Sequence, residues 1–283
     1  MKPFPKVSIV VLNYNGKDDL RKCLLSLFRL DYSNFEVIVV DNNSTDGSLE
    51  EARQHFPRVV FIKNAENLGF SVGNNVGIRY VLEKMTDFVL LLNNDTEVEK
   101  SFLTKMIKVA NLNPQAGLLS PLIFAGNTDK IWFSGGSIDW FRMKTTHLEG
   151  ALDALSGCAM LIRAEVFAKI GLLDEDFFLY FEDTDFSLRA RQAGFSNLLV
   201  REATVRHFEK SEKNKKNKVY WLVLSGLIFF QKNAPNYLKL WHWFYLLLRR
   251  TKNWLDLRRD KNDVIALAVR KAYGDFKQFG RKQ

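Results

Sequence analysis

The chain has 283 residues, of which 47% are hydrophobic and 26% are charged, a composition that excludes wholesale disorder. This length is enough for one large α/β domain with an appendage, or for two small domains. The two cysteines, Cys23 and Cys158, lie far apart in apolar stretches without Cys-x-x-Cys or Cys/His spacing. They are therefore predicted to be reduced core thiols of a cytosolic protein.

The net charge of +9 is unevenly distributed along the chain. Residues 210–283 hold 18 Lys and Arg against 5 Asp and Glu, whereas residues 1–209 hold 23 against 27. Such an asymmetry indicates an anionic partner, for which anionic lipid and nucleic acid are the two candidates. We expect no signal peptide, since the amino terminus runs directly into a strand pattern, and no spanning helix.

The first hundred residues alternate between strand and helix patterns. Apolar, β-branched runs predict strands that are buried on both faces over 6–12, 35–40, 59–63 and 88–92. Amphipathic segments predict helices over 18–30, 49–56 and 69–82. This order indicates an open, mostly parallel sheet with helices on both faces. A polar cluster follows each strand, and these clusters should converge at the carboxyl edge, where such sheets bind ligands.

The pattern loosens after a helix expected over 101–109. Residues 117–160 predict short, partly antiparallel strands and loops, and 164–171 predict a helix. Residues 177–193 are interpreted as a strand-like start, an acidic turn and a helix. Residues 197–206 predict a late strand that ends at His207.

The carboxyl-terminal segment changes character at Lys210. The charged run EKSEKNKKNK is predicted to be a mobile loop, followed by aromatic, amphipathic segments over 219–230 and 237–248 that are too short to span a bilayer. Helices of this type lie in the lipid interface, with rings at headgroup depth and cations on anionic lipid. The alternative is that they pack on the preceding domain or form a dimer interface.

Two acidic motifs follow predicted strands. Asp41 opens DNNSTDGS, where a carboxylate can accept a hydrogen bond from a nucleobase or ribose, although a plain strand-to-helix turn explains the motif as well. Asp95 lies in LLLNNDTEVE, where it could bind Mg²⁺ or Mn²⁺ or simply cap a helix.

Two further motifs carry titratable groups. Glu182, Asp183 and Asp185 cluster in FEDTDFSLRARQAG, and adjacent carboxylates raise each other's pKa, which favours a general base. The alternative is an acidic helix start with Arg189 paired on the same face. His207 in VRHFEKS could be a third metal ligand, but a lone histidine is more often structural.

The order of six blocks decides between these alternatives. They are VSIVVLNYNG, VVDNNSTDGS, ENLGFSVGNNVGI, LLLNNDTEV, SGCAMLIRAEVFAKIGLLDEDFF and YFEDTDFSLRARQAGF. With these blocks the chain resembles the family-2 glycosyltransferases of the GT-A fold, and within them the rhamnosyltransferase-like branch, over roughly residues 6–235. A G-x-G-x-x-G dinucleotide motif is lacking after the first strand, which argues against a dehydrogenase.

The resemblance implies a role for individual residues. Asp183 would be the catalytic base, with Glu182 beside it orienting the acceptor, and Asp95 and His207 would hold the metal. Asn93 replaces the first acid of the family's Asp-x-Asp motif. Gly157 would allow the sugar or acceptor to approach the backbone. The residues expected around the nucleotide-sugar are Asn13, Asn15, Asp41, Asn43, Asn67, Gly69, Asn74, Asn93, Asn94 and Gly157.

The resemblance also implies an activity and its partners. We expect an inverting, Mg²⁺- or Mn²⁺-dependent transferase that moves a sugar from a nucleotide-sugar donor, dTDP-L-rhamnose, to a saccharide or polyisoprenoid-linked acceptor in cell-surface polysaccharide synthesis. UDP- and GDP-sugars remain open, as does a non-catalytic nucleotide-binding assembly subunit. The expected domains are a catalytic domain over 1–209, with a nucleotide-binding half 1–100 and an acceptor-binding half 101–209, and a basic helical extension over 210–283.

The expected location is the cytoplasm, peripheral at the inner face of the membrane. The extension would contact anionic lipid there, or form a homodimer. Nucleic acid is not expected as a partner, because the tail's aromatics come in apolar runs rather than singly between cations.

Overall fold

The computed structural model describes residues 4–147, 149–209 and 215–279. The chain divides into two compact units. Among the described residues, the first unit comprises 4–137, 147, 149–175 and 182–209, and the second comprises 138–146, 176–181 and 215–279. Two short internal segments, 138–146 and 176–181, thus group with the carboxyl-terminal helices rather than with the sheet.

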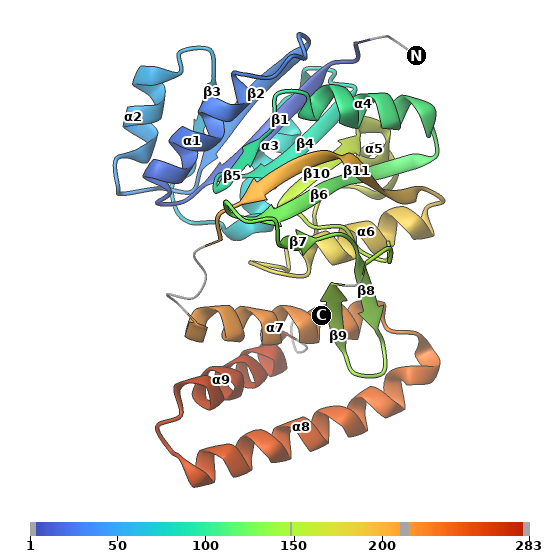
Figure 1. The fold of residues 1–283 in the computed structure, drawn as a ribbon. Coiled ribbons are helices and arrows are strands. Elements are labelled where there is room, and N and C mark those ends of the chain that lie inside the picture. The colour runs from blue at the N-terminus through green and yellow to red at the C-terminus, as the bar shows by residue number, and fades with distance from the viewer. Residues whose placement is uncertain (1–3, 148, 210–214, 280–283) are drawn as a thin grey trace. The chain divides into compact units, whose positions relative to one another are not determined.

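A nine-stranded sheet forms the centre of the first unit (Figure 1). Its strand order is β3-β2-β1-β4-β10-β6-β11-β5, with β7 paired to β6. The strands are β1 (Val7–Asn13), β2 (Phe35–Asp41), β3 (Val60–Lys63), β4 (Phe88–Asn93), β5 (Thr96–Val98), β6 (Ala116–Ala125), β7 (Ile131–Phe133), β10 (Ala159–Arg163) and β11 (Ser196–His207). A separate hairpin pairs β8 (Gly136–Asp139) with β9 (Lys144–His147).

The strand directions decide which loops meet. Strands β1 to β4 are mutually parallel, with Asn13 level with Asp41 and Leu12 level with Asn93. Strand β10 runs antiparallel to both β4 and β6, so β6 and its parallel neighbour β11 point the same way as β1–β4. The ends of β1, β2, β4 and β11 and the beginning of β10 therefore share one edge of the sheet.

Helices cover both faces of this sheet, as the alternating pattern predicted. They are α1 (Lys17–Leu27), α2 (Ser48–His55), α3 (Gly69–Glu83), α4 (Phe102–Leu112), α5 (Ala164–Ile170) and α6 (Glu182–Gln192). Residues of α1, α2 and α4 share one apolar core, and those of α3, α5 and α6 share the other. Strand β1 feeds both, because Ile9 and Val11 enter the first core and Val10 enters the second.

Two glycines let α3 lie close to β1. A Cβ atom at Gly77 would stand 2.6 Å from Val10 Cγ1, and one at Gly73 would stand 2.6 Å from Leu12 Cδ1. Larger residues would push the helix away from the sheet. The close approach fixes the amino-terminal end of α3 beside the ends of β1 and β2.

Three details differ from the sequence predictions. Residues 177–181 are not a strand, because Tyr180 and Phe181 both have a φ of 69°, in the left-handed region. Residues 96–98, for which no strand was predicted, form the short strand β5 against β11. Of the predicted mobile loop, residues 215–218 are the first turn of a helix, and residues 210–214 lie outside the described part.

The second unit contains α7 (Lys215–Asn233), the 3-10 turn η2 (Asn236–Leu238), α8 (Lys239–Arg259) and α9 (Val264–Phe279). The sequence patterns had indicated only two shorter apolar segments here. Helix α7 packs on α9 and carries the unit's core: Phe229 stacks on Trp140, and Phe230 lies edge-on to it. Within the described residues, no helix combines the length and apolar character needed to cross a membrane.

Candidate active site

A network of buried polar side chains joins the ends of β1 and β2. Asn13 Nδ2 donates to Asp41 Oδ1 (2.8 Å), and to the hydroxyls of Ser44 (3.1 Å) and Ser48 (2.9 Å). Asn13 Oδ1 accepts from Asn94 Nδ2 (2.8 Å), which extends the network to the end of β4. Asp41 also accepts from the backbone N–H and the hydroxyl of Ser44. Asn13, Asp41 and Asn94 thus lie together, and their contacts hold the loops in place.

The turns of this region have residues with positive φ angles, a conformation that favours asparagine. Asn15 and Asn43 have φ values of 52° and 62°, which asparagine tolerates better than most residues. Asn15 Oδ1 also accepts from Thr45 N at 2.8 Å, which ties the loop after β1 to the loop after β2. Both residues border the polar edge, as the sequence predicted.

A second chain of amides links β2, β3 and α3. Asn42 Nδ2 donates to the oxygen of Asn67 (3.2 Å) and to the carbonyl of Gly69 (2.9 Å), while Asn42 Oδ1 accepts from Asn64 (2.8 Å). Asn42 was not predicted as a site residue, although the doubled asparagine after the strand was a usable signal. The side chain of Asn74 donates to Phe70 O within α3, so its amide N–H group is used inside the helix.

Asp95 and His207 meet where β5 pairs with β11. His207 is opposite Thr96 in the antiparallel pair, and the backbone N–H of Phe208 donates to Asp95 O (2.8 Å). His207 Nε2 therefore stands 3.2 Å from Asp95 Oδ1. Within the described residues, Asp95 Oδ1 and His207 Nδ1 are buried without a hydrogen bond.

An aromatic cluster surrounds His207. The ring of Trp132 lies edge-on to His207, with 4.5 Å between centroids, and Trp132 Nε1 donates to Glu209 Oε2 (3.2 Å). The ring of His147 lies against Trp132, and its Nδ1 is 2.9 Å from Trp132 O. Sequence reasoning missed Trp132 and His147, because only the folded hairpin region brings them to the end of β11.

Asp183 is held at the first turn of α6. Its Oδ2 accepts from Gly157 N (2.9 Å), and its Oδ1 accepts from Thr184 N (2.7 Å). Burial raises the pKa of Asp183, and these two N–H groups oppose that rise. A Cβ atom at Gly157 would come 3.2 Å from Asp183 Cβ, so the glycine gives the carboxylate room to reach the backbone. A base with a raised pKa suits proton abstraction near neutral pH.

Glu182 is the neighbouring buried acid. Burial raises its pKa well above the ordinary range, and the charge of Asp183 raises it further. Its Oε2 makes no hydrogen bond within the described part of the chain. The two residues that lead into it, Tyr180 and Phe181, have strained left-handed backbones. The strained backbone and the buried Oε2 without a hydrogen bond to any described residue make the start of α6 a candidate functional site.

The third acid of this motif has a structural role. Asp185 Oδ2 pairs with Arg189 Nε at 2.6 Å, one helical turn later. Arg189 also donates to the carbonyls of Ile170 and Leu172. For Asp185, the alternative of an intrahelical pair with Arg189 is therefore confirmed.

The paired backbones of β4 and β10 connect the metal-ligand candidates to the base. Asn93 N donates to Cys158 O (2.9 Å), and Gly157, whose N–H holds Asp183, directly precedes Cys158. Burial raises the pKa of the Cys158 thiol well above its ordinary value, and the charges of Asp95 and Asp183 raise it further. The strand pairing places Cys158 beside Asn93, two residues before Asp95, and directly after Gly157, whose N–H holds Asp183, so these groups lie at one edge of the sheet.

The residues at this edge fit a divalent cation in part. Among the described residues, no group of three or more His, Cys, Asp or Glu side chains could hold a metal by itself. Asp95 and His207 offer one carboxylate and one imidazole, and both carry a buried atom without a hydrogen bond. Two protein ligands suit Mg²⁺ or Mn²⁺ when diphosphate oxygens and water complete the coordination.

Comparison with known proteins gives the family. The profile of "Glycosyl transferase family 2" matches residues 8–171, which is more than half of the chain. The chain belongs to glycosyl transferase family 2. The matched region contains the sheet edge from Asn13 to Gly157, while Asp183 and His207 lie beyond it.

Two similar proteins are named for the sugar transfer that they carry out. The chain is 30% identical over 199 residues to the "Low-salt glycan biosynthesis hexosyltransferase Agl10" of Haloferax volcanii, covering 66% of this chain and 62% of that protein. It is 26% identical over 229 residues to an "N-acetylglucosaminyl-diphospho-decaprenol L-rhamnosyltransferase" of Mycobacterium tuberculosis, covering 70% and 75%. The chain thus spans less than two thirds of the archaeal protein's length.

Solved structures show that the fold is GT-A. A mannosyltransferase from Pyrobaculum calidifontis in complex with GDP-Man and Mn²⁺ superposes with a TM-score of 0.62 at 15% identity, covering 95% of this chain and 73% of that one. GalNAc-T7 with UDP, GalNAc and Mn²⁺ gives a TM-score of 0.63 at 20% identity, covering 73% and 43%. At these identities the likeness concerns the fold alone.

Proposed function

We propose that this family-2 protein is an inverting glycosyltransferase that moves L-rhamnose from dTDP-L-rhamnose to a hydroxyl of a saccharide or lipid-linked acceptor, at the cytoplasmic face of a membrane. One observation carries the proposal. The half-buried Asp183, whose carboxylate is held by Gly157 N and has a raised pKa, shares a sheet edge with the Asp95–His207 pair. A base and a cation site at one edge are what single-displacement transfer to a hydroxyl needs.

The chemistry follows from these positions. Asp183 removes the proton of the acceptor hydroxyl, whose oxygen forms a bond to the anomeric carbon as the bond to the nucleoside diphosphate breaks on the opposite face. One displacement inverts the anomeric centre, and no covalent sugar–enzyme species is needed. Glu182, beside the base, orients the acceptor. Asn13, Asn15, Asp41, Asn43, Asn67, Gly69, Asn74, Asn93 and Asn94 form the nucleotide side of the site.

Asp95 and His207 would hold the Mg²⁺ or Mn²⁺ ion. When bound, this ion neutralises the charge that develops on the departing diphosphate. The 3.2 Å separation of His207 Nε2 and Asp95 Oδ1, which sets one imidazole nitrogen beside one carboxylate oxygen, supports this assignment. Trp132, packed edge-on against His207, would keep the imidazole in orientation.

The rhamnosyl donor rests on relatives. Besides the mycobacterial protein, a "dTDP-rhamnosyl transferase RfbF" of Shigella flexneri is 26% identical over 191 residues. A thermal-shift series with dTDP, UDP and GDP, each with and without Mn²⁺, distinguishes the donors. The cognate nucleotide at about 100 times its Kd stabilises by about 2.7 kcal/mol and raises the melting temperature most.

The carboxylate pair on α6 offers a matched test of the mechanism. Asp183→Asn should lower kcat for sugar transfer by about 10²- to 10⁴-fold, because the general base is lost. Its melting temperature should not fall, since a buried charge with a raised pKa is removed. The control, Asp185→Asn, breaks the buried pair with Arg189 and should lower stability while kcat stays near wild type. Equal transfer rates for wild type and Asp183→Asn would refute the base, whereas absence of transfer and of donor hydrolysis in the wild type itself would favour a non-catalytic assembly subunit.

A further inference from the structure

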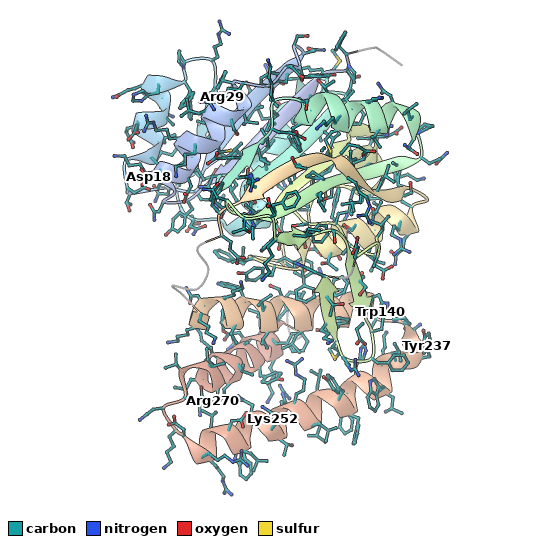
Figure 2. All side chains as sticks on the ribbon, viewed as in Figure 1. Asp18, Arg29, Trp140, Tyr237, Lys252 and Arg270 are labelled. Atoms are coloured by element: carbon teal, nitrogen blue, oxygen red, sulfur yellow. The ribbon has the colours of Figure 1, made fainter. Side chains whose placement is uncertain are left out.

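A basic pocket lies between α8 and α9, wholly within the second unit. Its volume is about 760 Å³, within the range of small-molecule sites. Five cations line it: Arg250, Arg258, Lys261, Arg270 and Lys277. Arg270 on α9 and, outside the pocket on α8, Lys252 are labelled in Figure 2. No Asp or Glu of the described chain lines it, so the pocket carries an uncompensated positive charge.

Aromatic rings orient two of these cations. The guanidinium of Arg258 lies 3.9 Å from the centroid of the Trp254 ring, and that of Arg250 lies 5.2 Å from the Tyr273 ring. Stacked guanidinium groups lose less freedom when they bind a phosphate, which they recognise through planar, paired N–H donors. The pocket is therefore built for a phosphate group rather than for a neutral ligand.

The rest of the pocket is mostly apolar. Trp254, Leu257, Tyr273, Gly274 and Asn253 complete its lining, and Asn253 Nδ2 donates to Ala266 O (3.0 Å). A Cβ atom at Gly274 would meet nothing within 4 Å, so the space over this glycine is open. A ligand that matches this lining has both a phosphate group and an apolar part. A phospholipid has both, whereas an inorganic anion lacks the apolar part.

The exposed surface of α8 points to the same ligand. Leu240, Trp243, Leu247 and Trp254 are exposed by 80%, 65%, 48% and 50%, and their spacing puts them along one helical stripe. Exposed aromatic and aliphatic rows flanked by Arg and Lys are typical of helices that lie in the membrane interface.

We propose that the α8–α9 pocket is a binding site for the phosphate headgroup of an anionic phospholipid, with the α8 stripe resting among the acyl chains. This inference deepens the proposed membrane location and rests on it. Binding in a pocket can be distinguished from general electrostatic attraction. A larger side chain that fills the pocket prevents lipid binding even when every charge is kept, whereas it leaves general attraction unchanged.

Titration of the full-length protein with water-soluble dihexanoyl phosphatidylglycerol, below its micelle concentration, tests the site. Dihexanoyl phosphatidylcholine is the control lipid. Gly274→Leu fills the open space without changing charge. Arg258→Gln with Arg270→Gln removes two pocket charges, and Lys252→Gln with Arg259→Gln removes two exposed charges of α8 outside the pocket.

The expected result is binding of the anionic lipid by the wild type and by the Lys252/Arg259 variant. Gly274→Leu and the Arg258/Arg270 variant should each weaken binding by about tenfold or more, and should bind less to vesicles of mixed phosphatidylcholine and phosphatidylglycerol. If Gly274→Leu does not fold, the two charge variants decide.

Several results would overturn the proposal. Wild-type affinity in Gly274→Leu, or equal losses in both charge variants, would leave only diffuse attraction. Inorganic phosphate bound as tightly as the lipid would indicate a free anion, displacement of the lipid by an RNA oligomer would indicate nucleic acid, and a stable dimer that excludes lipid would indicate a second copy. Nucleotide thermal shifts on the same variants should be unchanged, so failure of the lipid site and failure of the transferase proposal are separable.

Discussion

The two halves of the sheet edge treat their buried polar groups in opposite ways. On the side of β1 and β2, Asn13 and Asp41 are buried, and each takes part in several internal hydrogen bonds. On the side of β5, β11 and α6, the described residues Asp95, Glu182 and His207 each keep a buried atom without a hydrogen bond. Buried polar atoms without hydrogen bonds cost stability, a cost that the 3.2 Å approach of His207 Nε2 to Asp95 Oδ1 offsets in part.

This difference separates support from chemistry. The asparagine network makes the loops rigid before any ligand arrives, which lowers the cost of ordering them on binding. The carboxylates of Asp95 and Glu182 and the imidazole of His207 keep buried atoms without hydrogen bonds to the described residues, and the metal and the acceptor would interact with these side chains. The most informative tests change a residue on one side of the sheet edge and measure both the stability of the protein and its binding of metal or nucleotide.

The largest expected effect is on the metal response of His207→Ala. Loss of a direct ligand should weaken Mn²⁺ binding by more than the roughly 10- to 100-fold that a supporting residue costs. Paramagnetic Mn²⁺ quenches nearby tryptophan fluorescence, and Trp132 lies edge-on to His207, so a fluorescence titration in the presence of nucleotide measures binding without turnover. The matched control, His55→Ala, changes an exposed histidine of α2. Equal quenching in both variants would remove His207 from the metal site.

On the other side, Asn13→Ala should act mainly on stability. It removes the donor to Asp41, Ser44 and Ser48 and leaves buried oxygens unmatched, at a cost of about 3 kcal/mol. Urea unfolding measures this loss, while kcat of the folded fraction should change far less than in Asp183→Asn. A variant that unfolds like wild type but has lost transfer would reverse the assignment of roles.

The smallest effect is a pH-dependent gain in stability for Glu182→Gln. Burial and Asp183 raise the pKa of Glu182, so the folded state binds its proton more tightly than the unfolded state does. The wild type keeps its full stability below the ordinary Glu pKa and loses some as pH rises through the raised pKa. The variant should thus melt higher than wild type at neutral pH, by roughly 2–4 °C per kcal/mol, and the gap should close toward pH 4. A constant gap across pH would contradict the raised pKa.

The sequence alone determined the parallel half of the fold and most of the edge. β-Branched runs such as 35–40 form strands wherever both of their faces are buried, and polar residues after them must lie at the carboxyl ends of the strands. For the same local reason Asn13, Asp41 and Asp95 were predicted as neighbours at one edge. The acidic start of α6 was visible too, as a charge pattern that suits a helix amino terminus.

Only the tertiary structure decided which partner each acid has. Asp183 and Asp185 stand two residues apart and look alike in the sequence, but Arg189 neutralises one while Gly157 N holds the other. Trp132 and His147 reach His207 through pairings in the loosely patterned middle of the chain, whose short strands carry little local signal. The α8–α9 pocket likewise needed the packing of two helices, because a cation's position along one helix does not say what it faces on the next. Contacts between residues distant in sequence set the burial and the pairing of a side chain. Burial and pairing, rather than residue type, then determine its pKa and whether it is available to bind a ligand.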